Sequence, residues 1–138
     1  MKNLTIEVSA NGQGLFDITD KVANAVARCD IEQGLANLFI QHTSASLTIQ
    51  ENADPKVLAD MQTFIAQLVP EDPSAYTHND EGPDDMPAHI RACLTQTHLA
   101  IPIVNGKLAL GTWQGIFLWE HRRARDRRDL VLSVQSFG

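Results

Sequence analysis

Apolar and polar residues alternate in several short stretches of the chain, which is the pattern of strands with one buried face. In the first stretch, Leu4, Ile6 and Val8 are separated by polar side chains. Further along, Asn105-Gly106 stands between two apolar runs and predicts a tight hairpin turn, because both residues tolerate positive φ angles. The predicted strands are residues 2–9, 35–41, 46–50, 99–104, 107–121 and 129–136.

The first predicted helix follows the opening strand. Asp17 or Thr19 is placed to cap it, and Val22, Val26 and Cys29 recur at helical spacing on one face.

A second helix follows Asn52 and Asp54, either of which is a suitable cap, with Pro55 at the first helical position. Its apolar residues form one stripe about 100° wide. We expect this stripe to be buried in the core: Val57, Leu58, Met61, Phe64, Ile65 and Leu68.

Prolines and a glycine mark residues 71–85 as an unusually long loop, and loops of that kind are often functional. Pro87 then predicts a short third helix with Ile90 and Leu94 facing inward. Together these elements predict one α+β domain spanning residues 1–138, with three helices and mainly antiparallel, sandwich-like sheets of about six or seven strands.

Composition limits the function classes. The 43% hydrophobic and 20% charged residues are typical of a globular protein rather than a disordered chain. The net charge of −6 argues against nucleic acid as a partner, and the absence of a long apolar run argues against a membrane. Two cysteines without a signal sequence favour a reducing, cytoplasmic location.

Three histidines fall on three different predicted elements: His42 at a strand end, His78 in the acidic loop and His89 in the short helix. Three imidazoles leave one position of a zinc ion open for catalysis, so these residues are candidate metal ligands. Cys93, one helical turn after His89, is a further possible ligand. We expect the remaining histidines to lie in a loop (His98) and at the outward end of a strand (His121).

Charged residues are concentrated in two segments. The loop acids Asp80, Glu81, Asp84 and Asp85 suit three roles: binding Mg²⁺ together with a phosphorylated substrate, orienting ligand histidines, or solvating the loop. Five of the 11 basic residues lie in residues 122–128 and suit either a phosphate clamp or an exposed hairpin tip.

In residues 112–120, alternation places Gln114 and Glu120 on one face with Ile116 and Leu118, and the aromatic side chains on the other. The face with Gln114 and Glu120 is either the lining of a pocket or an exposed face of the sheet.

Five blocks in order resemble the YjbQ-like family of small bacterial and archaeal proteins: QHTSASLTIQENADPKVLADM, LVP, HNDEGPDDMPAHI, IPIVNGKLALGTWQGIFLWEHR and DLVLSVQSFG. The resemblance covers about residues 35–135 and implies an α+β domain that forms a homotrimer, with sites near subunit boundaries. It also implies thiamine-phosphate synthase activity, in some members a secondary one, which joins hydroxymethylpyrimidine diphosphate to thiazole phosphate and releases pyrophosphate. The chain departs from the family in HRRARDRRD, where many relatives have a glycine-containing turn.

The resemblance and the residues together give a set of expected roles. The metal, zinc or, with a phosphorylated substrate, magnesium, would be held by His42, His78 and His89. The expected catalytic residues are Asp84, Asp85 and Glu120, with Glu120 or Asp85 as proton acceptor. The expected substrate-binding residues are Thr43, Ser44, Glu51, Asn52, Gln114 and Arg122.

Two other functions use the same residues. A metal-dependent hydrolase would activate water at the three histidines, with Asp84 or Glu120 as base. A non-enzymatic trimer would use the polar face to bind a ligand without turnover.

Overall fold

The computed structural model describes residues 2–138, which form an α+β fold of two antiparallel sheets and three α-helices, as the sequence predicts. The strands are β1 (Lys2–Asn11), β2 (Gly14–Asp17), β3 (Gly34–Ile40), β4 (Ala45–Glu51), β5 (His98–Val104), β6 (Lys107–Leu108), β7 (Gln114–Glu120) and β8 (Arg125–Ser136). The helices are α1 (Thr19–Ala27), α2 (Pro55–Leu68) and α3 (Asp85–Leu94), with a 3₁₀ turn at Pro73–Ala75. Within these residues, each helix is too short or too polar to cross a membrane.

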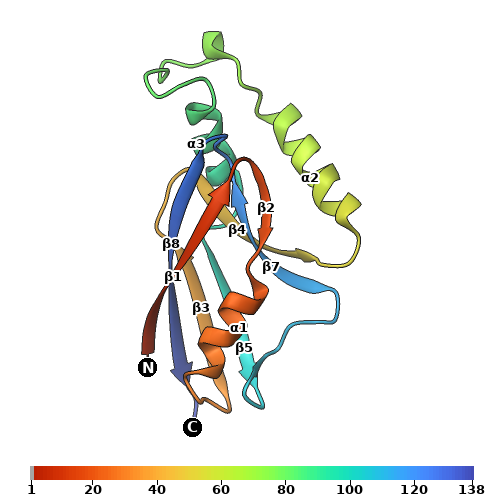
Figure 1. Ribbon diagram of the computed structural model, residues 1–138, viewed down its shortest axis with the longest axis vertical. Helices are drawn as coiled ribbons and strands as arrows, with labels where there is room; N and C mark the ends of the chain where they lie inside the picture. The colour runs from red at the N-terminus through yellow and green to blue at the C-terminus, as the bar shows by residue number, and fades with distance from the viewer. Residues whose placement is uncertain (1) are drawn as a thin grey trace.

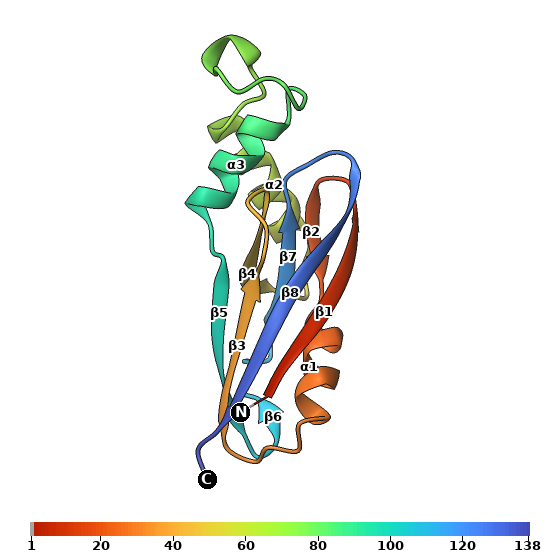
Figure 2. The same ribbon diagram turned by 90° about the vertical axis from the view of Figure 1, so that its left-hand side faces the viewer.

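The larger sheet has five strands in the order β1-β8-β3-β5-β6, and the smaller has three in the order β2-β7-β4. Figures 1 and 2 show an elongated molecule, with α3 and the connection from α2 at one end. The inner face of the larger sheet packs against β4, β7 and α1, and this shared interior is the hydrophobic core. The sandwich-like arrangement is therefore confirmed, and the short strands β2 and β6 raise the strand number to eight in the described chain.

Helix α1 begins at Thr19, and the side chain of Asp17 holds its first turn. Asp17 Oδ1 accepts hydrogen bonds from the Thr19 backbone N–H (2.9 Å) and the Thr19 hydroxyl (2.6 Å). Val22, Val26 and Cys29 are buried, as their spacing predicts.

Helix α2 begins as predicted, with Pro55 in its first turn and Asp54 Oδ1 accepting from the Lys56 N–H at 2.9 Å. The predicted burial of its apolar stripe is wrong for most of the stripe. Ile65 is buried, but Phe64 is 64% exposed and Leu68 is 56% exposed. Helix α2 packs against β2 and β4 of the small sheet, and no other part of the described chain covers Phe64 and Leu68. Phe64 and Leu68 line a groove of about 640 Å³, here called the α2 groove, together with Asp60, Met61, Ile65, Leu94 and Trp119.

Strand β7 is the middle strand of the small sheet, so both of its edges are paired, and its residues after Gln114 are buried on both faces. Ile116 and Leu118 share one face, as the alternation predicts, but this face is buried in the core, while Phe117 and Trp119 are buried on the opposite face. Trp119 Nε1 donates to Gln62 of α2 at 2.8 Å. Neither an exposed sheet face nor an open pocket wall therefore describes this strand as a whole.

Helix α3 buries polar residues instead of the expected apolar ones. Leu94 is 57% exposed, so its predicted inward orientation is wrong. Arg91 takes the inward position, where its Nε and Nη2 donate to the Val69 carbonyl at 3.3 and 2.7 Å. This guanidinium ties α3 to the residue that follows α2.

Candidate metal centre

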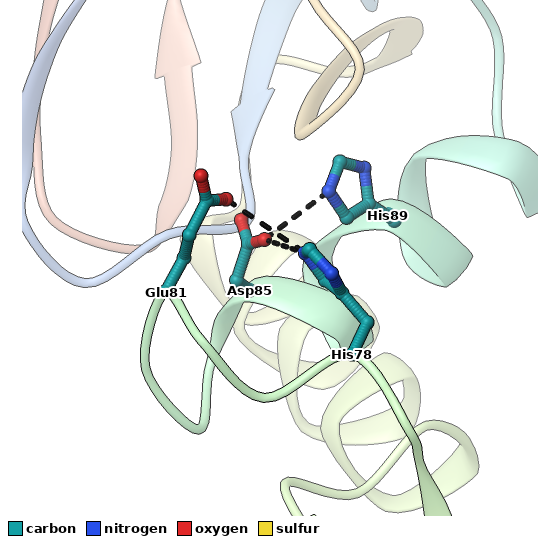
Figure 3. Close-up of side chains that lie close together, drawn as sticks. All are labelled: His78, Glu81, Asp85 and His89. Atoms are coloured by element: carbon teal, nitrogen blue, oxygen red, sulfur yellow. Dashed lines mark hydrogen bonds and ion pairs between the residues drawn. The ribbon is translucent and has the colours of Figure 1, made fainter.

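Four side chains meet at the start of α3: His78 and Glu81 from the preceding loop, and Asp85 and His89 from the helix itself (Figure 3). One nitrogen or oxygen atom of each lies within 4.8 Å of the corresponding atoms of the others. Asp85 and His89 are four residues apart and share one face of α3. We call these four residues the His78–His89 cluster.

The distances inside the cluster suit a small metal ion. Asp85 Oδ2 lies 2.8 Å from His78 Nε2 and 3.2 Å from His89 Nε2, and His78 Nε2 lies 3.7 Å from Glu81 Oε2. Two ligand atoms, each about 2.1 Å from a tetrahedral zinc, lie roughly 3.4 Å apart. The cluster therefore fits zinc with only small movements of the side chains.

A backbone contact orients His89. Its Nδ1 lies 3.1 Å from the carbonyl oxygen of Thr43, which can only accept a hydrogen bond, so Nδ1 carries the proton. With the proton on Nδ1, Nε2 presents its lone pair toward Asp85 Oδ2, an acceptor 3.2 Å away, so a cation between the two atoms would satisfy both. Metal-binding histidines commonly have this arrangement, in which the second nitrogen donates to a carbonyl or carboxylate.

The carboxylates of Asp84 and Asp85 are nearly buried and are held by arginine. Arg122 donates to Asp85 Oδ1 at 2.6 Å and to Asp84 Oδ2 at 3.1 Å, and the Arg123 N–H donates to Asp84 Oδ2 at 2.9 Å. Burial alone would raise both pKa values. For Asp84 the hydrogen bonds from Arg123 and Arg122 outweigh burial and lower its pKa.

For Asp85 the contacts with His78, Glu81, Arg122 and His89 likewise lower the pKa despite burial. Both acids are therefore ionised at neutral pH, which suits metal ligands and their supports. Arg122, a predicted substrate-binding residue, is itself bound to these acids.

His42 lies outside the cluster. Its Nε2 accepts the Asp129 backbone N–H at 2.8 Å, and its Nδ1 lies 3.3 Å from Arg128 Nη1. Burial, followed by the charge of Arg128, lowers its pKa, so the ring is neutral. His42 and the cluster residue His89 line the same cavity of about 210 Å³, here called the His42 cavity, together with Thr43, Ala92, Cys93 and Thr97.

Glu120 is fully buried in an ion pair with Arg128. Arg128 Nε lies 3.1 and 2.9 Å from the two carboxylate oxygens of Glu120, and Nη2 lies 2.8 Å from one of them. Burial raises the pKa of Glu120, although the pairing with Arg128 opposes this. In the arginine segment Arg123, Arg125 and Arg127 are exposed and Arg128 is buried, but the predicted hairpin tip is wrong, because the segment leads from β7 of the small sheet to β8 of the large one.

Three predicted substrate-binding residues gather at the other end of the small sheet. Glu51 pairs with Gln114 between β4 and β7, and Asn52 Nδ2 donates to the Gln114 carbonyl at 3.4 Å. They are separated from Thr43 and Ser44 by the length of β4, about 20 Å at 3.3 Å per residue. Within one chain, these residues and the His78–His89 cluster do not form a single site.

His121 is placed differently from the prediction of an outward strand end. It is fully buried, with Nε2 3.0 Å from the Ser46 hydroxyl oxygen and its ring 5.4 Å from that of Trp119. Burial, then the charges of Arg91 and Arg128, lower the pKa of His121 to about 3. His98 is exposed at the start of β5 rather than in a loop.

Glu81 joins the cluster although sequence reasoning did not single it out from the other loop acids as a partner of the histidines. The spacing His-x-x-Glu-x-x-x-Asp-x-x-x-His, from His78 to His89, is the signal that could have identified it. Only the step from Asp85 to His89 lies on a helix, where residues four apart share a face, and His78 and Glu81 reach this face from the loop.

Comparisons with known proteins agree with one another. The family model described as "UPF0047 protein YjbQ-like" matches residues 3–136. The UPF0047 protein sll1880 of Synechocystis sp. is 53% identical over 127 residues, covering 92% of this chain and 86% of the relative. YjbQ of Escherichia coli is 42% identical over 132 residues, 95% of each chain. Among solved structures, hypothetical protein APE1520 of Aeropyrum pernix superposes with a TM-score of 0.87 at 28% identity, covering 99% of each chain.

Proposed function

The chain belongs to the UPF0047 (YjbQ-like) family, and we propose that it is a metal-dependent enzyme that acts on a small phosphorylated molecule. The metal would be held by His78, Asp85 and His89, with Glu81 beside them. The observation that supports this most strongly is the contact of His89 Nδ1 with the Thr43 carbonyl, which directs the Nε2 lone pair toward the other cluster atoms.

The donor set favours zinc or a similar ion. Two imidazole nitrogens suit zinc, whereas magnesium prefers oxygen ligands and keeps several waters. Magnesium remains the alternative if a substrate phosphate supplies further oxygens. When bound, the metal would supply a Lewis acid that stabilises negative charge on a departing phosphate or diphosphate.

The proposed reaction is the thiamine-phosphate synthase type, in which a thiazole nitrogen displaces diphosphate from the pyrimidine partner. Such a nitrogen already has its lone pair and needs no deprotonation. A reaction without a proton acceptor suits these residues, because none of the three candidate carboxylates is free: Asp84 and Asp85 are bound to Arg122, and Glu120 is bound to Arg128. In this proposal Asp85 is a metal ligand rather than a proton acceptor. The substrate would lie in the His42 cavity, which is next to the proposed metal because His89 lines it.

A hydrolase is the second candidate, and the exposure of Glu81 favours it. The Glu81 side chain is 63% exposed and adjoins His78, so it could accept a proton from an attacking water. Two histidines and one carboxylate also hold zinc in hydrolytic enzymes.

The proposal includes assembly as a homotrimer, which the family resemblance implies. The α2 groove supports it, since Phe64, Leu68 and Leu94 expose apolar surface on adjacent helices. A trimer could also bring the Glu51, Asn52 and Gln114 end of one chain toward another chain. A cytoplasmic location is part of the same proposal, and the free thiols of Cys29 and Cys93 are consistent with it.

Elemental mass spectrometry of untagged protein tests the metal site. We expect close to one zinc-type ion per chain, lost in His89→Ala and kept in His98→Ala, whose exposed histidine lies outside the cluster. The same three proteins are then mixed with the two thiamine precursors, and pyrophosphate release is measured. Release that needs both precursors and His89 supports the transferase, and phosphate release from one precursor supports the hydrolase. Metal binding without turnover would leave the non-enzymatic ligand-binding function.

A further inference from the structure

The segment between β3 and β4, residues 42–44, lies between two groups of polar side chains. On one side the Thr43 carbonyl accepts from His89 of the cluster. On the other side the segment contacts the buried Glu120–Arg128 pair. The orientation of His89 therefore depends on the contacts that fix residues 42–44 on the side away from the cluster.

Arg128 holds this segment at Ser44. Its Nη2 donates to the Ser44 hydroxyl at 2.9 Å and lies 3.5 Å from the Ser44 carbonyl oxygen. The same nitrogen donates to Glu120 Oε1 at 2.8 Å. One guanidinium thus joins a buried carboxylate of β7 to the residue directly after Thr43.

The neighbouring residue of β8 holds the other side of Thr43. The Asp129 N–H donates to His42 Nε2 at 2.8 Å, and the Gln41 N–H donates to the Asp129 carbonyl at 3.1 Å. Thr43 is therefore flanked by two residues that are both tied to Arg128-Asp129.

We propose that Arg128 is a positioning residue, which acts through Ser44 to hold the Thr43 carbonyl against His89 Nδ1 and so fixes the tautomer and direction of the His89 ring. Glu120, expected from the sequence to be catalytic, would serve as the fixed counter-ion that orients Arg128. This role rests on the proposed function, because the value of a fixed His89 lies in metal binding.

The planar fork of arginine suits this role better than lysine does. Nε and Nη2 engage Glu120 together, while Nη2 also reaches Ser44. A lysine ammonium is a compact charge on a flexible stem, so it cannot reproduce the planar contacts with Glu120 and Ser44 at the same time. The Arg128→Lys variant keeps the buried charge but removes the bridge.

Two readouts test the proposal: the His89 tautomer, from long-range ¹H–¹⁵N NMR of the metal-free protein at neutral pH, and the affinity for zinc added alone. In the wild type we expect the proton on Nδ1. Loss of an outer partner of a metal ligand typically weakens binding about 10–100-fold. We expect a loss of that size in Arg128→Lys, a smaller loss in Ser44→Ala, and signal from the Nε2-protonated form in both.

Arg127→Ala is the matched control. Arg127 is the neighbouring arginine, with an exposed side chain that pairs with Glu7 and Asp129. Its removal should leave the His89 tautomer and the zinc affinity unchanged.

Wild-type tautomer and affinity in both Ser44→Ala and Arg128→Lys would overturn the proposal. If Arg128→Lys does not fold, Ser44→Ala decides by the same two readouts, because it removes the bond without leaving a buried charge unpaired. Failure of the wild type to bind zinc or magnesium would refute the proposed function, whereas the tautomer measurement would still test the positioning role.

Discussion

Helices α2 and α3 lie next to each other, but they differ in what they bury. The apolar stripe of α2 predicts a core helix, yet Phe64 and Leu68 remain exposed. The sequence of α3 predicts a short helix with Ile90 and Leu94 facing inward, yet Leu94 is exposed and Asp85 and Arg91 are each only 2% exposed. An apolar stripe shows where burial is possible, but the elements packed against the helix decide which part of the stripe is buried. Buried charge requires specific partners, and α3 finds them in distant parts of the chain.

Among the variants that test this contrast, truncation of Arg91 is expected to lower the stability of the protein most. Arg91→Ala would leave the Val69 carbonyl without its donor and create a cavity, lowering the free energy of unfolding by about 3 kcal/mol. Urea unfolding followed by circular dichroism measures this. Leu94→Ala, on the exposed side of the same helix, should cost much less, and equal costs would contradict the contrast.

The pH dependence of His121 is the next largest effect. Its pKa is about 3 in the folded state because of burial and the nearby Arg91 and Arg128, and about 6.5 when unfolded. Between these values the unfolded chain binds more protons, so stability falls as pH falls below about 6.5. At about 1.4 kcal/mol per pH unit, we expect a loss of about 2 kcal/mol between pH 7 and pH 5.

The variant His121→Gln, measured by urea unfolding at both pH values, checks this assignment. Its stability should change less between pH 7 and pH 5 than that of the wild type. An equally steep loss would show that another group is responsible.

The start of α2 tests the contribution of local sequence. Asp54→Ala removes the side chain that accepts from the Lys56 N–H and should lower the free energy of unfolding by about 1 kcal/mol. Asp54→Ser can still cap the helix and should recover most of this loss. Thermal denaturation measures the stability of both variants. Equal destabilisation of Asp54→Ala and Asp54→Ser would contradict the expectation.

The exposed face of α2 is expected to have the smallest effect on the stability of a single chain. Phe64→Ser should change the free energy of unfolding by no more than about 0.5 kcal/mol under dilute conditions. It should, however, reduce the trimer fraction in sedimentation velocity, while Ala66→Ser, exposed on the same helix, should not. A large loss of stability without a change in assembly would mean that Phe64 packs within its own chain.

The predictable parts of the fold depend on neighbouring residues. Asp54 and Pro55 define the start of α2, and Asn105-Gly106, with φ angles of 52° and 77°, form the expected turn. The strands follow from period-two alternation. The family and the α+β class follow from ordered blocks along nearly the whole chain.

The site was less predictable because its geometry depends on contacts between distant residues. Asp85 and His89 share one face of α3 and His78 reaches them from the preceding loop, whereas His42 is bound instead to the Asp129 N–H of β8. The burial of Glu120 depends on Arg128, eight residues later on a strand of the other sheet. Local patterns contain no information about such partners.

The position of β8 has a consequence for folding kinetics. This strand lies between β1 and β3, and its pairing with β1 matches Lys2 with Val134 and Asn11 with Arg125. Contacts between residues more than a hundred positions apart raise the contact order, and folding slows as contact order rises. During synthesis β1 must wait for residues 125–136 to leave the ribosome before it can pair. Until then its edge is open to other chains, and we expect slow folding and a need for protection from aggregation at this stage.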